Sequence, residues 1–327
     1  MRLLKLVPDN TNIDFLKWRK VAMALSVIMI VASIALVAVR GLNLGVDFVG
    51  GQMMRVEFTN PPPLDQLRSK VDSLGLGEAT IQQFGSPKDI SIRTPLPEGD
   101  KSAADAAANK LKAGIQAAYP DAKFGQVDTV SGKVSGELIT TGALALGLAM
   151  IAISIYIWFR FEWQFGVGAL FALFHDVALT FGFFALTQLE FDLNIVAALL
   201  TIIGYSLNDT IVVYDRVREN LKKYRKMDIV ALLNLSVNET LSRTIMTNVF
   251  MFITLGVLLV MGPEVIFGFT AAMLLGIFIG TYSSVYMAAP LLVWMKVGPD
   301  SFTARDTDGP GGAERTGPRK SNDGAVV

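Results

Sequence analysis

The sequence predicts a polytopic α-helical membrane protein with six transmembrane helices and a small α+β domain between the first two. Hydrophobic residues make up 52% of the 327-residue chain, and the mean hydropathy is +0.46, which is too apolar for an ordinary soluble domain. The apolar residues gather in runs of about 17–25, the length that crosses a bilayer as a helix. The chain has no cysteine and a single histidine, which excludes disulfides and argues against a histidine-rich metal site.

The first predicted span covers residues 20–39. It is long enough to cross the membrane and lacks a small-residue cleavage site near its end, so we interpret it as an uncleaved anchor and not as a removed signal peptide. Five further apolar runs predict spans at 138–158, 165–186, 194–214, 244–261 and 266–293.

The orientation is predicted from the basic residues in the short loops. The first 20 residues contain five Lys or Arg and the predicted loop 215–243 contains seven, whereas the opposite loops 187–193 and 261–265 contain none. The positive-inside rule therefore predicts a cytoplasmic N-terminus over 1–19 and a cytoplasmic loop over 215–243. The C-terminus is expected on the same side, as a disordered tail over 294–327 whose end is rich in Gly, Pro and charge.

Residues 40–137 are expected to form the α+β domain outside the membrane. Alternating and periodic patterns predict elements in the order β-α-β-β-α-β, at 52–59, 63–74, 79–84, 89–94, 102–119 and 124–134. This order is typical of a ferredoxin-like fold. The domain shows neither a nucleophile–base pair nor a glycine-rich phosphate loop, so a binding or force-transmitting role is favoured over catalysis. A passive spacer remains an open alternative.

A glycine-rich element, Leu44–Gly51, precedes this domain. Gly45, Gly50 and Gly51 allow a sharp re-entry from the membrane into a strand or a close backbone approach, and Asp47 can cap a turn. Ordinary turn chemistry explains the element equally well.

Asp209 lies inside the hydrophobic run of the fourth span, about 22 Å along the helix from Asn194 and in its inner half. An isolated carboxylate in a bilayer is costly unless it is protonated, paired or wetted, so it is a candidate functional site. Tyr205 and Asn208 lie within one helical turn of it. The alternative is a hydrogen-bonded acid with a purely structural role.

Arg243 and Thr247 begin the fifth span. Because the fourth and fifth spans are antiparallel, Arg243 is expected to be able to approach Asp209. An arginine that moves towards and away from a carboxylate would poise it between its protonated and ionised forms, which is the physics of a proton carrier. The alternative for Arg243 is a snorkelling interfacial arginine.

His175 and Asp176 occupy the middle of the third span. Adjacent helical residues point about 100° apart, so the two are not expected to share one partner. They are candidates for a relay group or a contact between helices. Buried polar residues that lock helix packing are the alternative.

Three stretches of these residues resemble the SecF family of protein-export membrane proteins. They are Gly45–Gly51 after the first span, Tyr205–Asn220 in the fourth, which is highly specific, and Thr240–Thr247 in the fifth. The resemblance covers roughly residues 15–295 and is supported by the paired residues Trp163-Gln164 and His175-Asp176. One departure lies after Thr247, where the family often has small hydroxyl residues and this chain has Asn248–Met251.

The resemblance implies a subunit without hydrolytic chemistry and without a cofactor, with protons as the coupling ion. The family belongs to the resistance-nodulation-division superfamily, pairs with SecD and assists protein export through the SecYEG channel in the bacterial inner membrane. Asp209, Arg243 and Thr247 match the family's proton-path residues. Further expected partners are YajC, YidC, exported unfolded polypeptides and membrane lipids, and no nucleic acid is expected.

Two other functions remain open at this point. One is half of a resistance-nodulation-division exporter of small molecules or lipids, although such exporters have about twice as many spans. The other is a scaffold for assembly of the export channel that couples no protons. A membrane protease is disfavoured because the sequence contains no HExxH motif.

Overall fold

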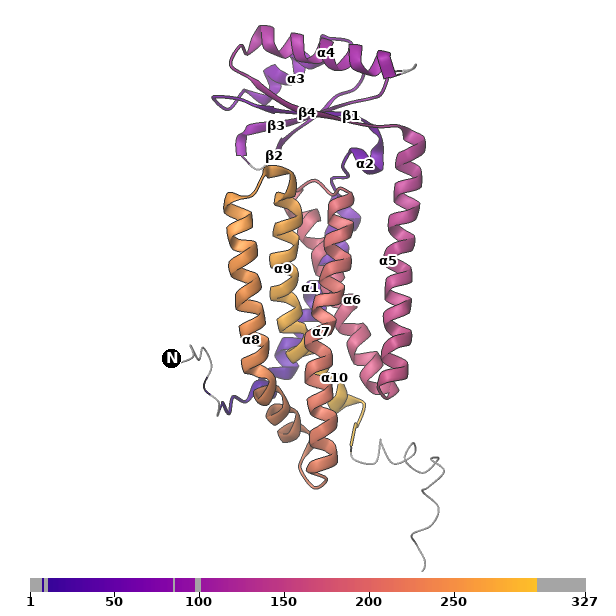
Figure 1. Cartoon of the computed structure of the whole chain (residues 1–327), viewed down its shortest axis with the longest axis vertical. Helices are drawn as coiled ribbons and strands as arrows, with labels where there is room; N and C mark the ends of the chain where they lie inside the picture. Colours follow the sequence, from indigo (N-terminus) through magenta and orange to yellow (C-terminus); the bar gives the residue numbers. More distant parts are fainter. Residues whose placement is uncertain (1–7, 9–10, 85, 98–100, 299–327) are drawn as a thin grey trace, which may run out of the picture.

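The computed structural model describes residues 8, 11–84, 86–97 and 101–298, and in this part of the chain it contains six helices long and apolar enough to cross a membrane (Figure 1). The first five are α1 (Arg19–Arg40), α5 (Gly132–Arg160), α6 (Trp163–Thr187), α7 (Leu193–Lys223) and α8 (Ile229–Met261). The last span joins α9 (Phe267–Ser283), the π-helical turn η3 (Ser284–Ala288) and α10 (Ala289–Trp294). The six predicted spans are confirmed. The predicted tail lies mostly in 299–327, outside the described residues.

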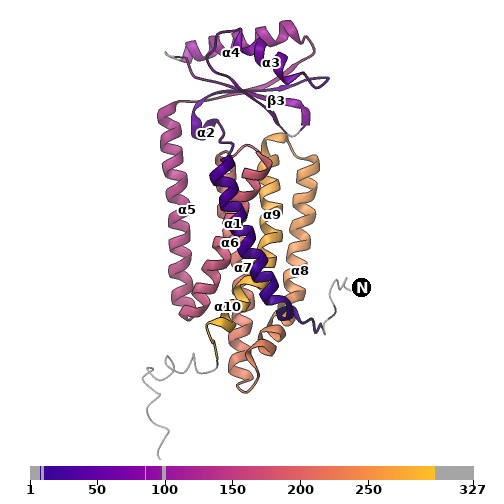
Figure 2. The same ribbon diagram turned by 180° about the vertical axis from the view of Figure 1, so that it is seen from behind.

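The helices form one bundle, and the α+β domain caps one end of it (Figure 1). Seen from behind, α1 crosses the bundle obliquely in front of α6, α7 and α9 (Figure 2). The 3-10 turn η1 (Phe15–Trp18) precedes α1 at the end opposite to the α+β domain, and another, η2 (Glu264–Ile266), precedes α9. Residue Ile13 donates its backbone N–H to Asn238 Oδ1 of α8 at 2.9 Å, which ties the N-terminal segment to the bundle.

The segment 215–243, predicted as the cytoplasmic connection between two spans, is helical except at 224–228. Helix α7 continues to Lys223, and α8 begins at Ile229, where Asp228 caps it by accepting the N–H of Val230 at 3.0 Å. The two helical extensions are joined by Asn220, which donates to Ser236 Oγ at 3.0 Å. Hydropathy marks only the apolar part of a helix, and these helices extend beyond their apolar parts.

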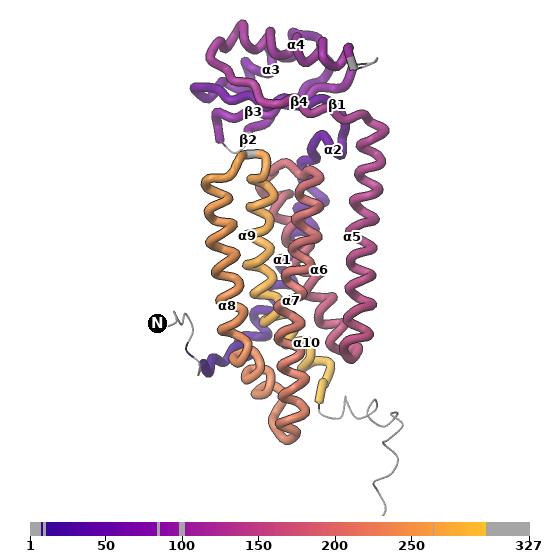
Figure 3. The backbone as a smooth tube through the Cα atoms, in the orientation of Figure 1, coloured from indigo at the N-terminus to yellow at the C-terminus, as the bar shows by residue number. Residues whose placement is uncertain are grey.

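The α+β domain has the predicted ferredoxin-like order. It consists of β1 (Gly51–Glu57), α3 (Leu64–Asp72), β2 (Thr80–Phe84), β3 (Ser86–Thr94), α4 (Lys101–Ala118) and β4 (Lys123–Val130). The strands form an antiparallel sheet in the order β2-β3-β1-β4. Helices α3 and α4 cover the sheet face that points away from the bundle (Figure 3), and Leu67 and Ile115 are buried with Met54 and Ile92 in one core cluster.

Small residues let α9 approach α7 closely. A Cβ at Gly280 would lie 3.0 Å from Cβ of Ser206, and one at Gly276 would collide with Ile202. Contacts this short leave no room for a larger residue, so the close crossing of α7 and α9 depends on the Gly276-xxx-Gly280 pair. This crossing brings the polar residues of the two helices together.

Candidate functional site

Asp209 lies on α7 and is almost completely buried, with 4% of its surface exposed. Its Oδ2 accepts a hydrogen bond from Nδ2 of Asn248 on α8 at 3.3 Å. A buried carboxylate needs such donors because it has lost its hydration. The structure thus gives Asp209 a hydrogen-bonding partner from the neighbouring helix.

Asn248 is the centre of a network that joins three helices. Its Oδ1 accepts from the hydroxyl of Tyr205 on α7 at 2.9 Å. Its Nδ2 donates to Thr281 Oγ1 on α9 at 2.6 Å as well as to Asp209. Tyr205 and Asp209 are four residues apart, so they lie on the same face of α7 and both reach Asn248.

Arg243 and Thr247 are not brought into direct contact with Asp209. Both side chains are exposed on the surface of α8, and among the described residues no ion pair joins Arg243 to a carboxylate. Arg243 still interacts electrostatically with Asp209. The hydroxyl of Thr247 donates to the carbonyl of Arg243 at 3.1 Å, within its own helix. Asn208 is also exposed.

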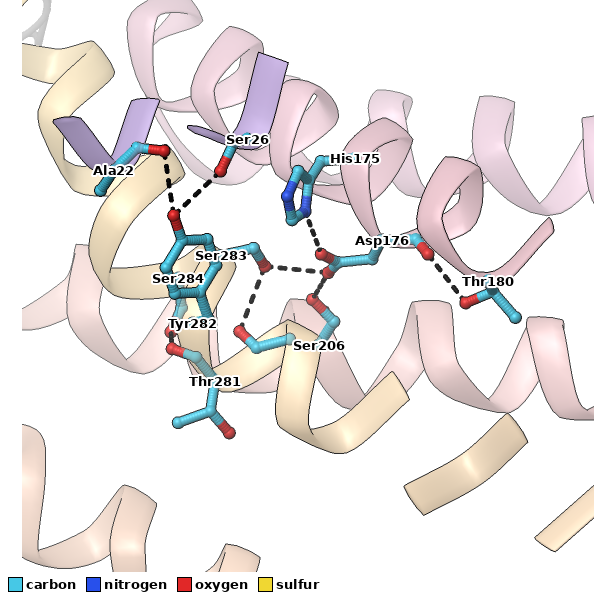
Figure 4. A network of polar contacts seen from close by, with 11 residues as sticks. Ala22, Ser26, His175, Asp176, Thr180, Ser206, Thr281, Tyr282, Ser283 and Ser284 are labelled. Carbon is cyan, nitrogen blue, oxygen red and sulfur yellow. Dashed lines mark hydrogen bonds and ion pairs between the residues drawn. The ribbon is translucent and has the colours of Figure 1, made fainter. Parts of the chain in front are cut away.

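A second polar cluster surrounds Asp176 (Figure 4). Oδ2 of Asp176 accepts from Ser206 of α7 at 2.5 Å and from Ser283 of α9 at 2.9 Å. Oδ1 forms a hydrogen bond with Nδ1 of His175 at 2.9 Å. We expected that His175 and Asp176 would not share one partner; they bind each other, and both are completely buried.

The imidazole of His175 packs against Tyr282 of α9. The two rings are nearly parallel, with an interplanar angle of 28° and centroids 6.0 Å apart. The hydroxyl of Tyr282 donates to the carbonyl of Ala22 on α1 at 3.0 Å and accepts from Ser26 at 3.1 Å (Figure 4). The cluster therefore extends from α6 through α9 to α1.

The glycine-rich element connects the outer domain to the N-terminus of α7. It contains the short helix α2 (Val46–Val49). The backbone N–H of Gly45 donates to the carbonyl of Phe191 at 2.9 Å. Oδ2 of Asp47 accepts the N–H of Leu193, the first residue of α7, at 2.9 Å. Asp192 caps the same helix end by accepting the N–H of Ile195 at 3.1 Å, so two carboxylates cap α7.

The glycines of this element differ in how strongly they are required. A Cβ at Gly45 would lie 2.9 Å from Oε1 of Glu190, the far end of a flexible side chain, and 3.3 Å from Cβ of Asp192. Gly50 and Gly51 have φ angles of 74° and 111°, which favour glycine, and a Cβ at Gly51 would lie 2.8 Å from the carbonyl oxygen of Thr94. The φ angles of Gly50 and Gly51 place a turn directly before β1. Through its hydrogen bonds to Phe191 and Leu193, the glycine-rich element also forms a joint between the outer domain and the start of α7.

The loop before α7 carries two carboxyl groups whose pKa is raised. Burial raises the pKa of Glu190 above its ordinary value, and the positive charge of Arg55 partly offsets this effect. Burial also raises the pKa of Asp192, against a hydrogen bond from Asn194. Both groups lie where the joint meets the membrane-spanning part, so proton uptake there acts on the joint itself.

Sequence reasoning missed the residues that complete both clusters: Asn248, Thr281, Ser206 and Ser283. Asn248 was noted only as a departure from a family pattern, although an amide inside an apolar span is itself a signal. The serines and the threonine gave no comparable signal, because such hydroxyls commonly bind their own helix backbone. Among the described residues, no group of three or more His, Cys, Asp or Glu could hold a metal ion.

Two family models match the chain. The one described as "Protein export membrane protein SecD/SecF, C-terminal" matches residues 110–298, and the one described as "SecD/SecF GG Motif" matches residues 35–62. Two curated relatives are named protein translocase subunit SecF. The one from Rhodobacter capsulatus is 44% identical over 304 residues, covering 89% of this chain and 91% of its own. The one from Rickettsia felis is 42% identical over 292 residues, covering 88% and 94%.

Solved structures of SecDF are also similar. The crystal structure of SecDF from Thermus thermophilus, described as a translocon-associated membrane protein, superposes with a TM-score of 0.81 at 32% identity. SecDF in a super-membrane-facing form gives 0.62 at 30% identity. The two alignments cover 89% and 91% of this chain but 40% of each solved chain, so this chain spans about two fifths of their length.

Proposed function

Because the chain belongs to the SecD/SecF family of protein-export membrane proteins, we propose that it is the SecF subunit of a SecD–SecF complex. In this proposal the complex uses the proton-motive force to assist late-stage polypeptide translocation through the SecYEG channel. The chain is a multi-pass membrane protein. We place it in the bacterial cytoplasmic membrane, with both termini cytoplasmic and residues 40–137 outside.

The observation that carries this proposal is the hydrogen bond between Asp209 and Asn248 at the meeting point of three helices. An ionised Asp209 only accepts hydrogen bonds, whereas a protonated one can donate. Proton uptake therefore weakens the hydrogen bond from the Asn248 amide, because the carboxyl group loses its charge and gains a donor of its own. Since the same amide binds Tyr205 and Thr281, the change alters how α7 is held to α8 and α9.

The exposed polar face of α8 supports a partner in the membrane. Arg243 and Thr247 lie on the surface of this chain, together with Asn208 of α7. A guanidinium facing lipid deep in a bilayer is costly, so such groups face protein or water. A SecD helix bearing an acidic residue has the chemistry to complete this site. The further candidate partners are YajC, YidC and the exported unfolded polypeptide.

The hydrogen bond from Leu193 to Asp47 connects α7, which carries Asp209, to the outer domain. Asp209 and the N–H of Leu193 belong to the same continuous helix, α7, and Asp47 holds that N–H from the base of the domain. A movement of α7 driven by proton uptake at Asp209 would thus be passed to residues 40–137. The domain would then act by transmitting force to the polypeptide outside the membrane.

The available energy is sufficient for such a movement. A membrane potential of about 100 mV supplies about 2.3 kcal/mol for each charge that crosses it. Since about 1.4 kcal/mol changes an equilibrium tenfold, one proton can bias a two-state domain equilibrium more than about tenfold. No hydrolytic step is required.

The test compares release of an exported protein from spheroplasts with and without a proton gradient. Asp209→Asn should fold, assemble with SecD at wild-type levels and lose the response to the gradient. Asp215→Asn is the matched control, because Asp215 lies on the same helix but pairs with Arg160 at the surface at 2.9 Å. A normal gradient response in assembled Asp209→Asn would support the scaffold function instead. Gradient-driven movement of a small molecule or lipid by reconstituted chain would support the exporter function.

A further inference from the structure

His175 and Asp176 lie at the midpoint of α6 and are completely buried, yet proton coupling at Asp209 does not use them. Burying two ionisable groups in the middle of a membrane span is costly unless they are paired and hydrogen-bonded. Every oxygen of the Asp176 carboxylate is occupied: Oδ2 by the hydroxyls of Ser206 and Ser283, and Oδ1 by the imidazole. The imidazole is therefore the part of the pair that still has a nitrogen without a hydrogen-bond partner in the described part of the chain.

In the described part of the chain, the nitrogen without a partner is Nε2 of His175. When Asp176 is ionised it only accepts hydrogen bonds, so a neutral His175 must then carry its proton on Nδ1 and donate it to Asp176. Nε2 is buried and has no hydrogen-bond partner among the described residues. A neutral ring with an unused lone pair, held against a carboxylate, can accept one proton there.

The net charge of the His175–Asp176 pair favours binding of a proton at Nε2. With a neutral imidazole and an ionised Asp176, the buried pair carries a net charge of minus one. Adding a proton at Nε2 makes an imidazolium–carboxylate pair with no net charge, which is less costly in a low-dielectric interior. The ring of Tyr282, stacked on the imidazole, offers its π-face to the new cation.

We propose that His175 and Asp176 form a second proton-binding site, in which Nε2 of His175 takes up one proton and the hydrogen-bonded Asp176 compensates its charge. Its contribution to export rests on the proposed function, whereas proton binding itself does not. The two sites meet on α7, because Tyr205 contacts the Asn248 network and the next residue, Ser206, contacts Asp176.

The surroundings of the pair contain few other charges. The elements packed against it contribute Ser26 from α1, Ser206 from α7, and Ser283 and Tyr282 from α9, with Tyr286 of η3 stacked beyond Tyr282. Among the described residues, His175 is the only cationic group that forms an ion pair with Asp176. Proton uptake is therefore governed by the pair and not by a third charge.

Uptake of the proton would act on three helices. Tyr282 links the imidazole to α1 through its bonds to Ala22 and Ser26, and Ser283 is followed directly by the π-helical turn η3. A π-helical turn is wider than an α-helical one and is frequently found at functional sites. A change in the charge of His175 would therefore alter the contacts that join α1, α6 and the end of α9.

The first test uses the fact that His175 is the only histidine of the chain. The complex is labelled with ring-15N histidine, purified through a histidine-free tag and placed in lipid bilayers. The wild-type minus His175→Asn difference spectrum isolates this imidazole by solid-state NMR. Between about pH 9 and about pH 5, we expect a neutral ring protonated at Nδ1 to become doubly protonated. A ring that keeps one protonation state over the whole range would overturn the proposal.

The second test asks whether the proton matters for export. His175→Asn retains an N–H that can donate to Asp176 but cannot titrate, whereas Ser283→Ala removes one hydrogen bond and keeps the titrating ring. We expect His175→Asn to lose the pH dependence of gradient-driven export, while Ser283→Ala retains it. Identical profiles in the two variants would reduce the pair to a packing contact. Failure of the proposed function would show separately, as an unchanged gradient response in Asp209→Asn, and would leave the NMR result standing.

Discussion

The most informative perturbation is Asn248→Ala, because this one side chain holds the Asp209 site together. The substitution removes the acceptor for Tyr205 and the donor to both Asp209 and Thr281. Hydrogen bonds between membrane helices are worth about 0.6 kcal/mol each on average, so three of them amount to about 2 kcal/mol of unfolding free energy. Asp209 also remains buried without its amide donor, which disfavours the ionised form.

Two measurements separate the structural from the functional effect. Unfolding in detergent should show the loss of about 2 kcal/mol, and export from spheroplasts should lose its response to the proton gradient. Asn238→Ala is the matched control on the same helix. Asn238 is also buried and makes hydrogen bonds to Ile13, but these lie far from Asp209. It should be similarly destabilised and keep its gradient response.

The result that would refute this reasoning is an equal gradient response in Asn248→Ala and Asn238→Ala at matched membrane levels. The Asn248 network would then be a packing device. A second informative outcome is loss of the response in both variants to the same degree. That would show that stability alone controls export, and the coupling role of Asn248 would be rejected.

Three further predictions concern the joint. Asp47→Ala removes a cap of α7, so the amide of Leu193 should lose about 1 kcal/mol of protection and exchange about fivefold faster with deuterium. Gly51→Ala should cost about 1–3 kcal/mol in thermal unfolding, because its φ is 111° and its Cβ would meet Thr94, whereas Gly136→Ala, which meets nothing, should cost nothing. Because burial raises the pKa of Glu190 on folding, its contribution to stability is full at low pH and is lost as the pH rises from its ordinary pKa of about 4.5 through the folded pKa. Glu190→Gln should flatten this dependence, and an unchanged pH profile of unfolding would contradict the effect of burial.

The fold could be predicted from the sequence because its strongest patterns are local. The apolar runs located all the spans, and alternation located the strands of the outer domain to within a few residues. The start of α8 at Ile229 was not located, because charged side chains mark the end of a membrane span and not the end of a helix. Hydrogen bonds such as Asn220 to Ser236, which hold the extensions together, depend on contact between separate helices.

The site could be predicted only in part, for a related reason. Asp209 stands out because one charge in an apolar run is costly wherever its neighbours lie. Its pairing with Asn248, and that of Asp176 with Ser206 and Ser283, depends on the rotation of each helix about its axis. The pattern of each helix alone does not fix how it faces its neighbours, so the expected approach of Arg243 to Asp209 was inferred from antiparallel direction without knowledge of that rotation.

The length of α7 allows the joint and the buried Asp209 to act together in the proposed function. Asp209 lies 16 residues beyond Leu193, or about 24 Å along the helix at 1.5 Å per residue. A tilt of about 10° about the level of Asp209 would move the N-terminus of α7 by about 4 Å. That is more than the bond between Asp47 and Leu193 can absorb at a length of 2.9 Å. Either that bond breaks or the glycine-rich element moves together with the start of α7. The Gly45–Phe191 hydrogen bond and the packed rings of Phe48 and Phe191 favour movement together. In the proposed function, a small rearrangement at the carboxylate would therefore be converted into a displacement of the base of the outer domain.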